Sequence, residues 1–342
     1  MTNARLEFPL PHLVGSDPGI EWTKDDAVAV DAAPNAETNL APEAVWPAEL
    51  ERDGTCGCVT PGVIPLPDGG LRMYYTQILP RAGYPAGAND YDNSTTRILS
   101  AHSEDGTDWT SEPGVRLTSE QGGAGPYRVV SPDVVPIPGD HTKLRMYFES
   151  CPGTQAVDTP IRSALSDDGG TTWILEAGVR LGGPGESVSS PCVHELEDGR
   201  CRLYCSQSGG GIVSAISTDG GLTFEREPGV RISKSLTHEA LTAFAPEVLR
   251  IAGGGYRMYY AGYADPARAC VLTATSDDGL TWEKHPEPVV VPGGKFDRIK
   301  CSEMSLATLP HSTGQSYRLF YEACDGTTAT CRGVWRILSA ST

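Results

Sequence analysis

The sequence predicts an all-β protein made of five similar units, each with four antiparallel strands. Three observations support this fold class: a turn motif that recurs along the chain, aromatic strand-like segments ahead of each copy, and frequent turn residues, with 39 Gly and 27 Pro among 342 residues. Repeats of this size that contain several short strands are typical of propellers rather than of helical solenoids. We therefore expect a single-domain, five-bladed β-propeller.

The recurring motif runs from Ser through Asp and Gly to an aromatic residue. Asp accepts backbone hydrogen bonds in a turn, and Gly adopts positive φ at no steric cost. We expect the motif to form the turn between the third and fourth strands of each unit, with the aromatic ring packed between neighbouring sheets. Its role is then structural rather than catalytic. The copies are residues 103–109, 166–173, 217–224 and 276–282, with a partial copy at 17–22.

Two further segments precede each copy. Alternating segments rich in aromatic residues are typical of strands, and we interpret them as the second strands: 71–75, 144–148, 202–204, 256–260 and 317–321. Ahead of these come the expected innermost strands, most of which contain a proline: 59–63, 130–134, 189–193, 244–248 and 301–305. Each unit therefore has four predicted strands.

The two ends of the chain complete one unit between them. Residues 336–340 match 97–101, whereas the turn motif expected next lies at 17–22. We expect the N-terminal strand to complete the last blade, which would close the ring and remove free sheet edges. Two long connections, 32–58 and 79–96, are expected to carry function or to be mobile. The predicted blades are 57–117, 128–181, 187–232, 243–291, and 300–342 together with 17–30.

Charge and composition restrict the partners. The formal net charge is −17, which disfavours binding to nucleic acid or to an anionic membrane surface. A small neutral or cationic ligand fits better. The sequence has no apolar run near the roughly 20 residues of a membrane span and no apolar core of a signal peptide. We therefore expect a cytoplasmic location.

The chain has ten cysteines. Without a secretory signal we expect free thiols that are buried as small apolar groups. Cys56 and Cys58 lack a partner pair at zinc-site spacing, so we expect no structural zinc site. No cofactor is predicted. A calcium ion on channel carboxylates would be compatible with the sequence, but no loop motif supports one.

Carboxylates converge where the innermost strands begin. Aligning these strands gives one ring of equivalent positions: Gly62, Asp133, Cys192, Glu247 and Met304, with Glu303 beside the last. A second ring lies where the second strands end: Thr76, Glu149, Ser206, Ala261 and Glu322. Neighbouring carboxylates push their pKa values apart, as a general acid that faces a base requires. We therefore predict that Asp133, Glu247, Glu149 and Glu303 are catalytic. Alternatively, some of them bind only backbone amides or an ion.

The remaining candidates would bind substrate: Arg128, Glu322, Tyr127, His238, Arg298 and Cys192. Basic residues in the loops at this mouth could bind an anion such as phosphate, or could pair with nearby acids; the set also includes Arg81, Lys295 and Lys300. Tyr127, with Tyr84 and Tyr91, could stack on a sugar ring or could anchor the loops.

These features resemble the five-bladed β-propeller glycosidases. The strand starts Ser131-Pro132-Asp133 and Ala245-Pro246-Glu247 and the Met-Tyr-Tyr endings are similar to the arabinanase and xylosidase, invertase and levansucrase, and intracellular mannoside phosphorylase families. The turn motif resembles the Asp box of sialidases. The resemblance implies retaining or inverting chemistry, with an Asp on the first blade and a Glu on a later one.

The resemblance transfers to this chain only in part. It assigns Asp133 to an acidic inner-strand position and Glu247 to the acidic start of the fourth blade. The first blade presents Thr60, Pro61 and Gly62 without a carboxylate, and the third presents Cys192, so a full hydrolytic triad does not carry over.

Two classes of function follow. In a glycoside hydrolase or phosphorylase, Glu247 would donate a proton to the leaving oxygen, and Asp133 or Glu149 would act as the base or stabilise positive charge. Alternatively, the same acids serve a lyase or cyclase, or the propeller binds a ligand without catalysis. The retained acids favour the first class, whereas the missing first-blade Asp favours the second. In either case the partner is a small molecule, for a glycosidase a glycoside or polyol-like compound.

Overall fold

The computed structural model describes residues 6–31, 57–80, 94–154, 156–311, 314–326 and 333–342. The regular structure of these residues is β-strand, apart from one short 3-10 helix, Thr237–Glu239, among them. None of the helices found there is long and apolar enough to cross a membrane. The all-β fold class predicted from the sequence is therefore confirmed. The long connections predicted to carry function, 32–58 and 79–96, lie largely outside the described residues.

The strands pair in chain order into five antiparallel units of four. The first unit comprises β3 (Gly57–Pro65), β4 (Leu71–Pro80), β5 (Ser94–Ser103) and β6 (Thr110–Ser111), and β7 (Leu117–Thr118) also pairs with β5. The second comprises β8 (Arg128–Ile137), β9 (Asp140–Cys151), β10 (Ile161–Ser166) and β11 (Ile174–Leu175). The third comprises β12 (Val188–Glu195), β13 (Cys201–Gln207), β14 (Ile212–Ser217) and β15 (Glu225–Arg226).

The fourth and fifth units follow the same plan. The fourth comprises β16 (Thr242–Ile251), β17 (Tyr256–Asp265), β18 (Arg268–Ser276) and β19 (Glu283–Lys284). The fifth comprises β20 (Lys300–His311), β21 (Gly314–Cys324), β22 (Trp335–Ser341) and, from the other end of the chain, β2 (Thr23–Val30). A short N-terminal strand, β1 (Leu13–Val14), pairs in parallel with β16.

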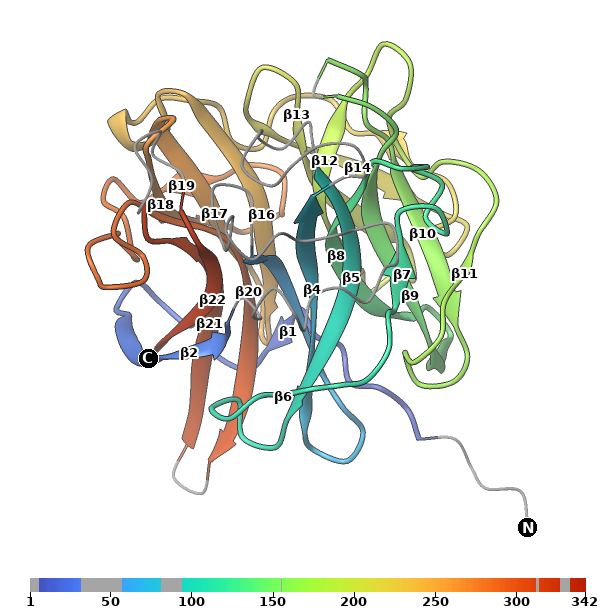
Figure 1. Cartoon of the computed structure of the whole chain (residues 1–342), viewed down its shortest axis with the longest axis horizontal. Coiled ribbons are helices and arrows are strands. Elements are labelled where there is room, and N and C mark those ends of the chain that lie inside the picture. The colour runs from blue at the N-terminus through green and yellow to red at the C-terminus, as the bar shows by residue number, and fades with distance from the viewer. Residues whose placement is uncertain (1–5, 32–56, 81–93, 155, 312–313, 327–332) are drawn as a thin grey trace.

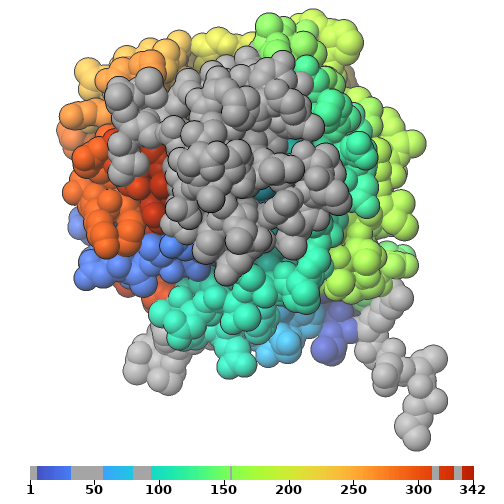
Figure 2. All heavy atoms as spheres, in the orientation of Figure 1, coloured from blue at the N-terminus to red at the C-terminus, as the bar shows by residue number. Residues whose placement is uncertain are grey.

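The first strands of the units gather at the centre of the molecule. In chain order β3, β8, β12, β16 and β20 each contact the next, and β20 also contacts β3. Figure 1 shows these strands near the middle and the short fourth strands toward the outside. On the face shown in Figure 2, the units follow one another around the rim in chain order, and the N-terminal blue segment lies beside the red C-terminal one.

Neighbouring units are joined by a repeated contact that we call the Arg-Tyr latch. It consists of an Arg and the aromatic residue two positions later on each second strand, which bind the turn motif of the next unit. In the first unit, Arg72 donates to Gly169 O at 2.5 Å and the Tyr74 hydroxyl donates to Gly170 O at 3.0 Å. The corresponding pairs are Arg145/Tyr147, Arg202/Tyr204, Arg257/Tyr259 and Arg318/Phe320.

The aromatic residue of each turn motif completes the latch. Trp173 stands edge-on to Tyr74 with a centroid distance of 5.7 Å. Equivalent pairs occur at all five junctions: Trp22 with Tyr259, Trp109 with Phe320, Phe224 with Tyr147, and Trp282 with Tyr204. In the turn itself, Asp168 Oδ1 accepts hydrogen bonds from the backbone N–H groups of Thr171 and Thr172. The aromatic side chain of each turn motif therefore packs on the preceding unit, and the Asp stabilises the turn that carries this side chain.

We predict that Trp173→Ala destabilises the fold by about 3–5 kcal/mol, because it removes a buried indole and its contact with Tyr74. The neighbouring Ile174 is 73% exposed, so Ile174→Ala should change stability by less than about 0.5 kcal/mol. Urea unfolding of both variants measures the difference. Equal losses would show that Trp173 does not hold the junction.

Candidate active site

The inner strands share a bulge where they pass the centre. In the first four units the first bulge residue has a left-handed backbone conformation, with φ between 48° and 54°, and a proline follows it. These residues are Thr60, Ser131, Ser190 and Ala245. Positive φ in non-glycine residues is uncommon and concentrates at functional sites, and a bulge re-aims the neighbouring side chains. In the fifth unit the irregularity contains Glu303 alone.

The register places the ring positions at equivalent levels. Asp133 pairs with Tyr147 and Glu247 pairs with Tyr259, in each case directly after the bulge. Gly62 pairs with Tyr74 and Cys192 pairs with Tyr204. In the fifth unit the equivalent aromatic residue is Phe320, which pairs with Ser305, whereas Met304 pairs with Tyr321. Two residues after these aromatic residues on the second strands come Thr76, Glu149, Ser206, Ala261 and Glu322. The sequence alignment therefore agrees with the strand register in the first four units, whereas in the fifth the equivalent position is Ser305 and the prediction of Met304 is wrong by one residue.

All five inner strands line one pocket of about 360 Å³, which we call the central pocket. Asp133, Glu247 and Glu303 lie in its wall. Its remaining lining is mainly the Pro, Ser and Thr residues of the bulges. The pocket thus has a polar wall with few titratable groups, as a site for a polar small molecule requires.

Asp133 has partners on both oxygens. Its Oδ1 lies 3.0 Å from Nε2 of His12, and its Oδ2 accepts a 2.7 Å hydrogen bond from Val193 N–H. Burial alone would lower the pKa of His12, but the charges of Asp133 and Glu247 outweigh it and raise this pKa to about 9. Asp133 and His12 therefore form a buried ion pair.

Glu247 also has partners from a neighbouring unit. Its Oε1 accepts hydrogen bonds from Leu306 N–H at 2.8 Å and from the Ser305 hydroxyl at 3.2 Å. Its Oε2 lies 3.9 Å from Nδ1 of His12. Burial raises the pKa of Glu247 to about 7, against the opposing charge of His12. Both carboxylates that the resemblance singled out are thus tied to the same histidine.

Glu303 reaches across the centre from the fifth unit. Its Oε2 accepts hydrogen bonds from the Ser131 hydroxyl at 3.0 Å and from the Ser190 hydroxyl at 3.4 Å, which belong to the second and third units. Burial raises the pKa of Glu303 well above its ordinary value, and the charges of Glu322 and Glu149 raise it further. These effects favour the protonated form of this carboxyl group.

Glu149 and Glu322 lie near Glu303, and we call these three residues the glutamate cluster. Burial raises the pKa of Glu149 to about 8, although the charge of Arg128 opposes this shift. Burial also raises the pKa of Glu322, to about 7, but hydrogen bonds from the Ser302 hydroxyl and Thr60 N–H and the charge of Lys300 favour its ionised form. Glu322 therefore ionises more readily than Glu149 or Glu303. The cluster holds protonated and ionised carboxyl groups together near neutral pH.

The other predicted binding residues are more dispersed. Arg128 is buried beside Glu149 and donates to Gly153 O, and its guanidinium lies 5.9 Å from the Tyr127 ring. Arg298 donates to Gly326 O, and His238 lines a separate pocket. The structure thus brings Arg128 to the glutamate cluster but does not gather the predicted basic residues in one place. Arg81, Tyr84 and Tyr91 lie outside the described residues.

Cys192 faces away from the glutamate cluster. Its Sγ lies 3.6 Å from Nε2 of His194 and accepts a hydrogen bond from Val248 N–H at 3.3 Å. The eight cysteines that the structure describes are all free thiols and all buried. His12, the partner of Asp133, was missed by the sequence reasoning, because the segment before the first repeat carries no motif that marks a contact with the centre.

Comparison with known proteins shows the fold. No protein-family model matches the sequence, and no curated protein matches it. Among solved structures, a putative glycoside hydrolase from Parabacteroides distasonis has 13% identity and a TM-score of 0.69, covering 94% of this chain and 96% of that one. The β-1,2-mannobiose phosphorylase from Listeria innocua has 12% identity and a TM-score of 0.65, covering 94% and 96%. The catalytic domain of a GH62 α-L-arabinofuranosidase from Coprinopsis cinerea has 12% identity and a TM-score of 0.64, covering 95% and 97%.

These matches span nearly the whole length of both partners. The chain therefore has the fold of the propeller glycosidases, as the sequence resemblance implied.

We predict that Glu149 makes the fold less stable as the pH rises. Its pKa is about 8 in the folded protein and near 4.5 when unfolded, so its favourable contribution is complete below about pH 4.5 and is lost as the pH rises through about 8. Glu149→Gln should not show this loss. Between pH 5 and pH 9 its free energy of unfolding should therefore rise by at least about 1 kcal/mol relative to that of the wild type. Urea unfolding across this range measures the difference.

Glu176→Gln is the matched control. Hydrogen bonds from Arg145 and Ser163 hold the pKa of Glu176 below its ordinary value, although burial opposes them. Its contribution is therefore constant from pH 5 to pH 9. A Glu149→Gln curve that runs parallel to the wild type would contradict the raised pKa.

Proposed function

We propose that this protein is a glycoside-active enzyme, either a hydrolase or a phosphorylase, that uses the glutamate cluster for acid–base catalysis. The observation that carries the proposal is the position of Glu303, whose carboxyl group is held across the central pocket by hydroxyl groups of two other units, with a pKa raised well above its ordinary value. Glycoside cleavage requires one carboxyl group that donates a proton and another that stays ionised. The cluster offers both.

We propose further that the five units are the blades of one closed five-bladed propeller, with the predicted blade boundaries and β2 completing the last blade. The Arg-Tyr latch supports this arrangement, because it recurs at every junction from the first unit to the fifth and again from the fifth to the first. The contact between β20 and β3 gives the same order.

In this mechanism Glu303 donates the proton to the leaving oxygen. Glu322 acts as the base or stabilises the developing positive charge, because Ser302, Thr60 N–H and Lys300 favour its ionised form. Glu149 shares the charge of the cluster and tunes the pKa of Glu303. The catalytic roles predicted for Asp133 and Glu247 stay predictions, and the experiment below tests Glu247 beside Glu303.

Phosphate dependence separates the two glycoside activities. Arg128 and Lys300 supply positive charge beside Glu149 and Glu322, where phosphate could bind by charge-assisted hydrogen bonds. One solved neighbour is named as a mannobiose phosphorylase and another as an arabinofuranosidase. The substrate would be a small glycoside or polyol-like compound, and the location cytoplasmic, as the sequence predicts.

A specific observation supports a second candidate function. The first unit presents Thr60 and Gly62 where the resembling hydrolases carry an Asp. A lyase or cyclase could use the glutamate cluster for proton transfer without that group, and a non-catalytic propeller would need only the pocket. Both alternatives predict no turnover of glycosides.

We predict that Glu303→Gln lowers kcat on the best glycoside substrate by about 10²-fold or more, because the amide cannot donate the proton. The measurement is turnover of a panel of aryl glycosides and short oligosaccharides, with and without phosphate. Glu283→Gln, an exposed acid on β19, is the control and should keep full activity.

The pattern among the variants identifies the acid. A loss of turnover in Glu247→Gln, together with full activity in Glu303→Gln, would show that Glu247 and not Glu303 donates the proton. Turnover that requires phosphate would identify a phosphorylase. Silence of the wild type across the panel would contradict glycoside chemistry and leave the second candidate.

A further inference from the structure

The end of the central strands away from the glutamate cluster holds a second group of chemically active side chains. His12, Cys192 and His194, which we call the His–Cys cluster, each place one candidate ligand atom within 4.8 Å of the others. All three residues are buried. His12 belongs to the N-terminal segment ahead of β1, whereas Cys192 and His194 lie two residues apart on β12. The proposed catalysis uses none of them.

His12 presents a nitrogen that lacks a protein partner. Its Nδ1 is buried and has no hydrogen-bond partner, whereas its Nε2 is held by Asp133 at 3.0 Å. Asp133 is fixed in turn by Val193 N–H. Histidines that bind a metal through one ring nitrogen usually donate the other N–H to a carboxylate, which sets the tautomer and the orientation of the ring. His12 has this arrangement before any metal is added.

The other two members have the spacing of ligands on one ion. Typical Zn–S and Zn–N distances of about 2.3 and 2.0–2.1 Å at a tetrahedral angle place the two ligand atoms about 3.6 Å apart, and Cys192 Sγ lies 3.6 Å from His194 Nε2. Val248 N–H points at the sulfur at 3.3 Å. This hydrogen bond would stabilise the thiolate that a metal requires.

We propose that His12 Nδ1, Cys192 Sγ and His194 Nε2 bind a Zn²⁺ ion, and that the Glu247 side chain moves toward this group to supply Oε2 as the fourth ligand. Glu247 Oε2 lies 3.9 Å from His12 Nδ1, whereas Leu306 N–H and the Ser305 hydroxyl hold the other oxygen of this carboxylate. Two imidazoles, a thiolate and a carboxylate in a buried tetrahedral set favour zinc over calcium or magnesium, which prefer oxygen ligands.

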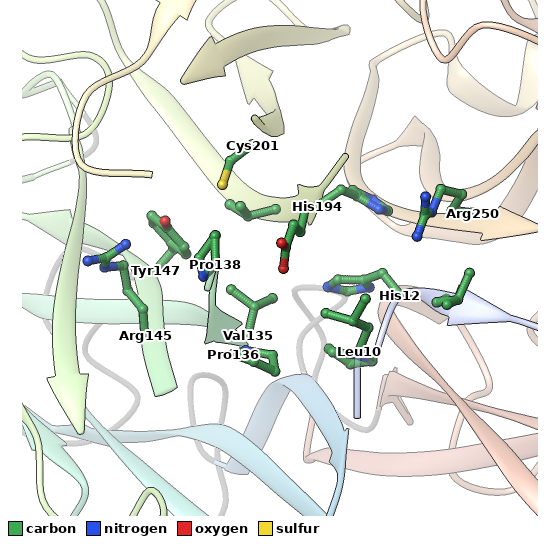
Figure 3. A pocket seen from close by; sticks show the side chains of 14 residues that line it. Leu10, His12, Val135, Pro136, Pro138, Arg145, Tyr147, His194, Cys201 and Arg250 are labelled. Atoms are coloured by element: carbon green, nitrogen blue, oxygen red, sulfur yellow. The ribbon is translucent and has the colours of Figure 1, made fainter. Parts of the chain in front are cut away.

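The surroundings favour a cation at this position. Two carboxylates lie against His12: Asp133 Oδ1 is 3.0 Å from its Nε2, and Glu247 Oε2 is 3.9 Å from its Nδ1. A pocket of about 450 Å³ leads to the cluster from the side where the inner strands end. Figure 3 shows His12 and His194 side by side at this pocket.

The site would be structural and would fasten the N-terminal segment to the units. At present that segment is held through β1, which pairs with β16, and through the hydrogen bond from Arg250 N–H to His12 O at 2.8 Å. A zinc ion would add a bond from this segment to β12 and one to Glu247 of the fourth unit. Ligands from distant parts of the chain couple metal affinity to folding.

The test is zinc binding by the full chain after removal of metals with a chelator. We expect one equivalent of Zn²⁺ by calorimetry and metal analysis, and a higher Tm in its presence. Cys192→Ala should weaken binding at least about 100-fold and abolish the rise in Tm, because a first ligand is lost. Cys205→Ala removes another buried thiol from the same unit and should bind zinc as the wild type does.

Two further measurements keep the test decisive if Cys192→Ala fails to fold. Co²⁺ in place of Zn²⁺ should give the visible bands of a tetrahedral site and a near-ultraviolet thiolate charge-transfer band in the wild type. His12→Gln, in the N-terminal segment, should lower zinc affinity while the circular dichroism of the sheets is retained. Absence of stoichiometric binding, a cobalt spectrum without sulfur, or binding that survives both variants would overturn the proposal, the last showing an adventitious ion only.

Discussion

The Arg-Tyr latch is the interaction on which the rest of the structure depends. In each unit an Arg and the aromatic residue that follows it two positions later bind the turn of the next unit, and the aromatic residue of that turn packs on the preceding unit. A single buried hydrogen bond contributes only about 0.5–1.5 kcal/mol. Five junctions with several such bonds, together with buried aromatic rings, fix the spacing between all the sheets. The inner strands consequently begin at matching levels around one centre.

This regular arrangement brings the bulge of every inner strand to the centre of the molecule. Four units use the bulge for a Ser, Thr or Ala followed by proline, and these residues supply hydroxyl and backbone groups. The fifth unit places Glu303 there instead, where its partners come from other units. Partial burial and the charges of Glu322 and Glu149 favour the protonated form of this carboxyl group. The fifth unit, whose bulge differs from those of the other four, thus supplies the proposed catalytic acid.

Carboxylates of the two predicted rings have different surroundings because their partners differ. Asp133 and Glu247 lie toward the His–Cys cluster, where His12 and backbone N–H groups bind them. Glu149 and Glu322 lie with Glu303, where burial raises the pKa of each of them. The two ends of the central strands therefore differ in charge and in chemistry: one favours a bound cation and the other a bound proton. The two predicted rings separate the same two pairs, but the partners that set their chemistry are contributed by other parts of the chain.

The sequence by itself determined the repeats, because a turn that needs Asp and Gly, and a strand that alternates aromatic residues, are set by local backbone and packing preferences. It also placed Asp133, Glu247 and Glu149 in register, since register follows from counting along matched strands. Only the tertiary structure decided that His12 binds Asp133, 121 residues away, and that Glu303 crosses to Ser131 and Ser190. Such contacts depend on how separate units converge in space, and burial among those units sets the protonation of each acid.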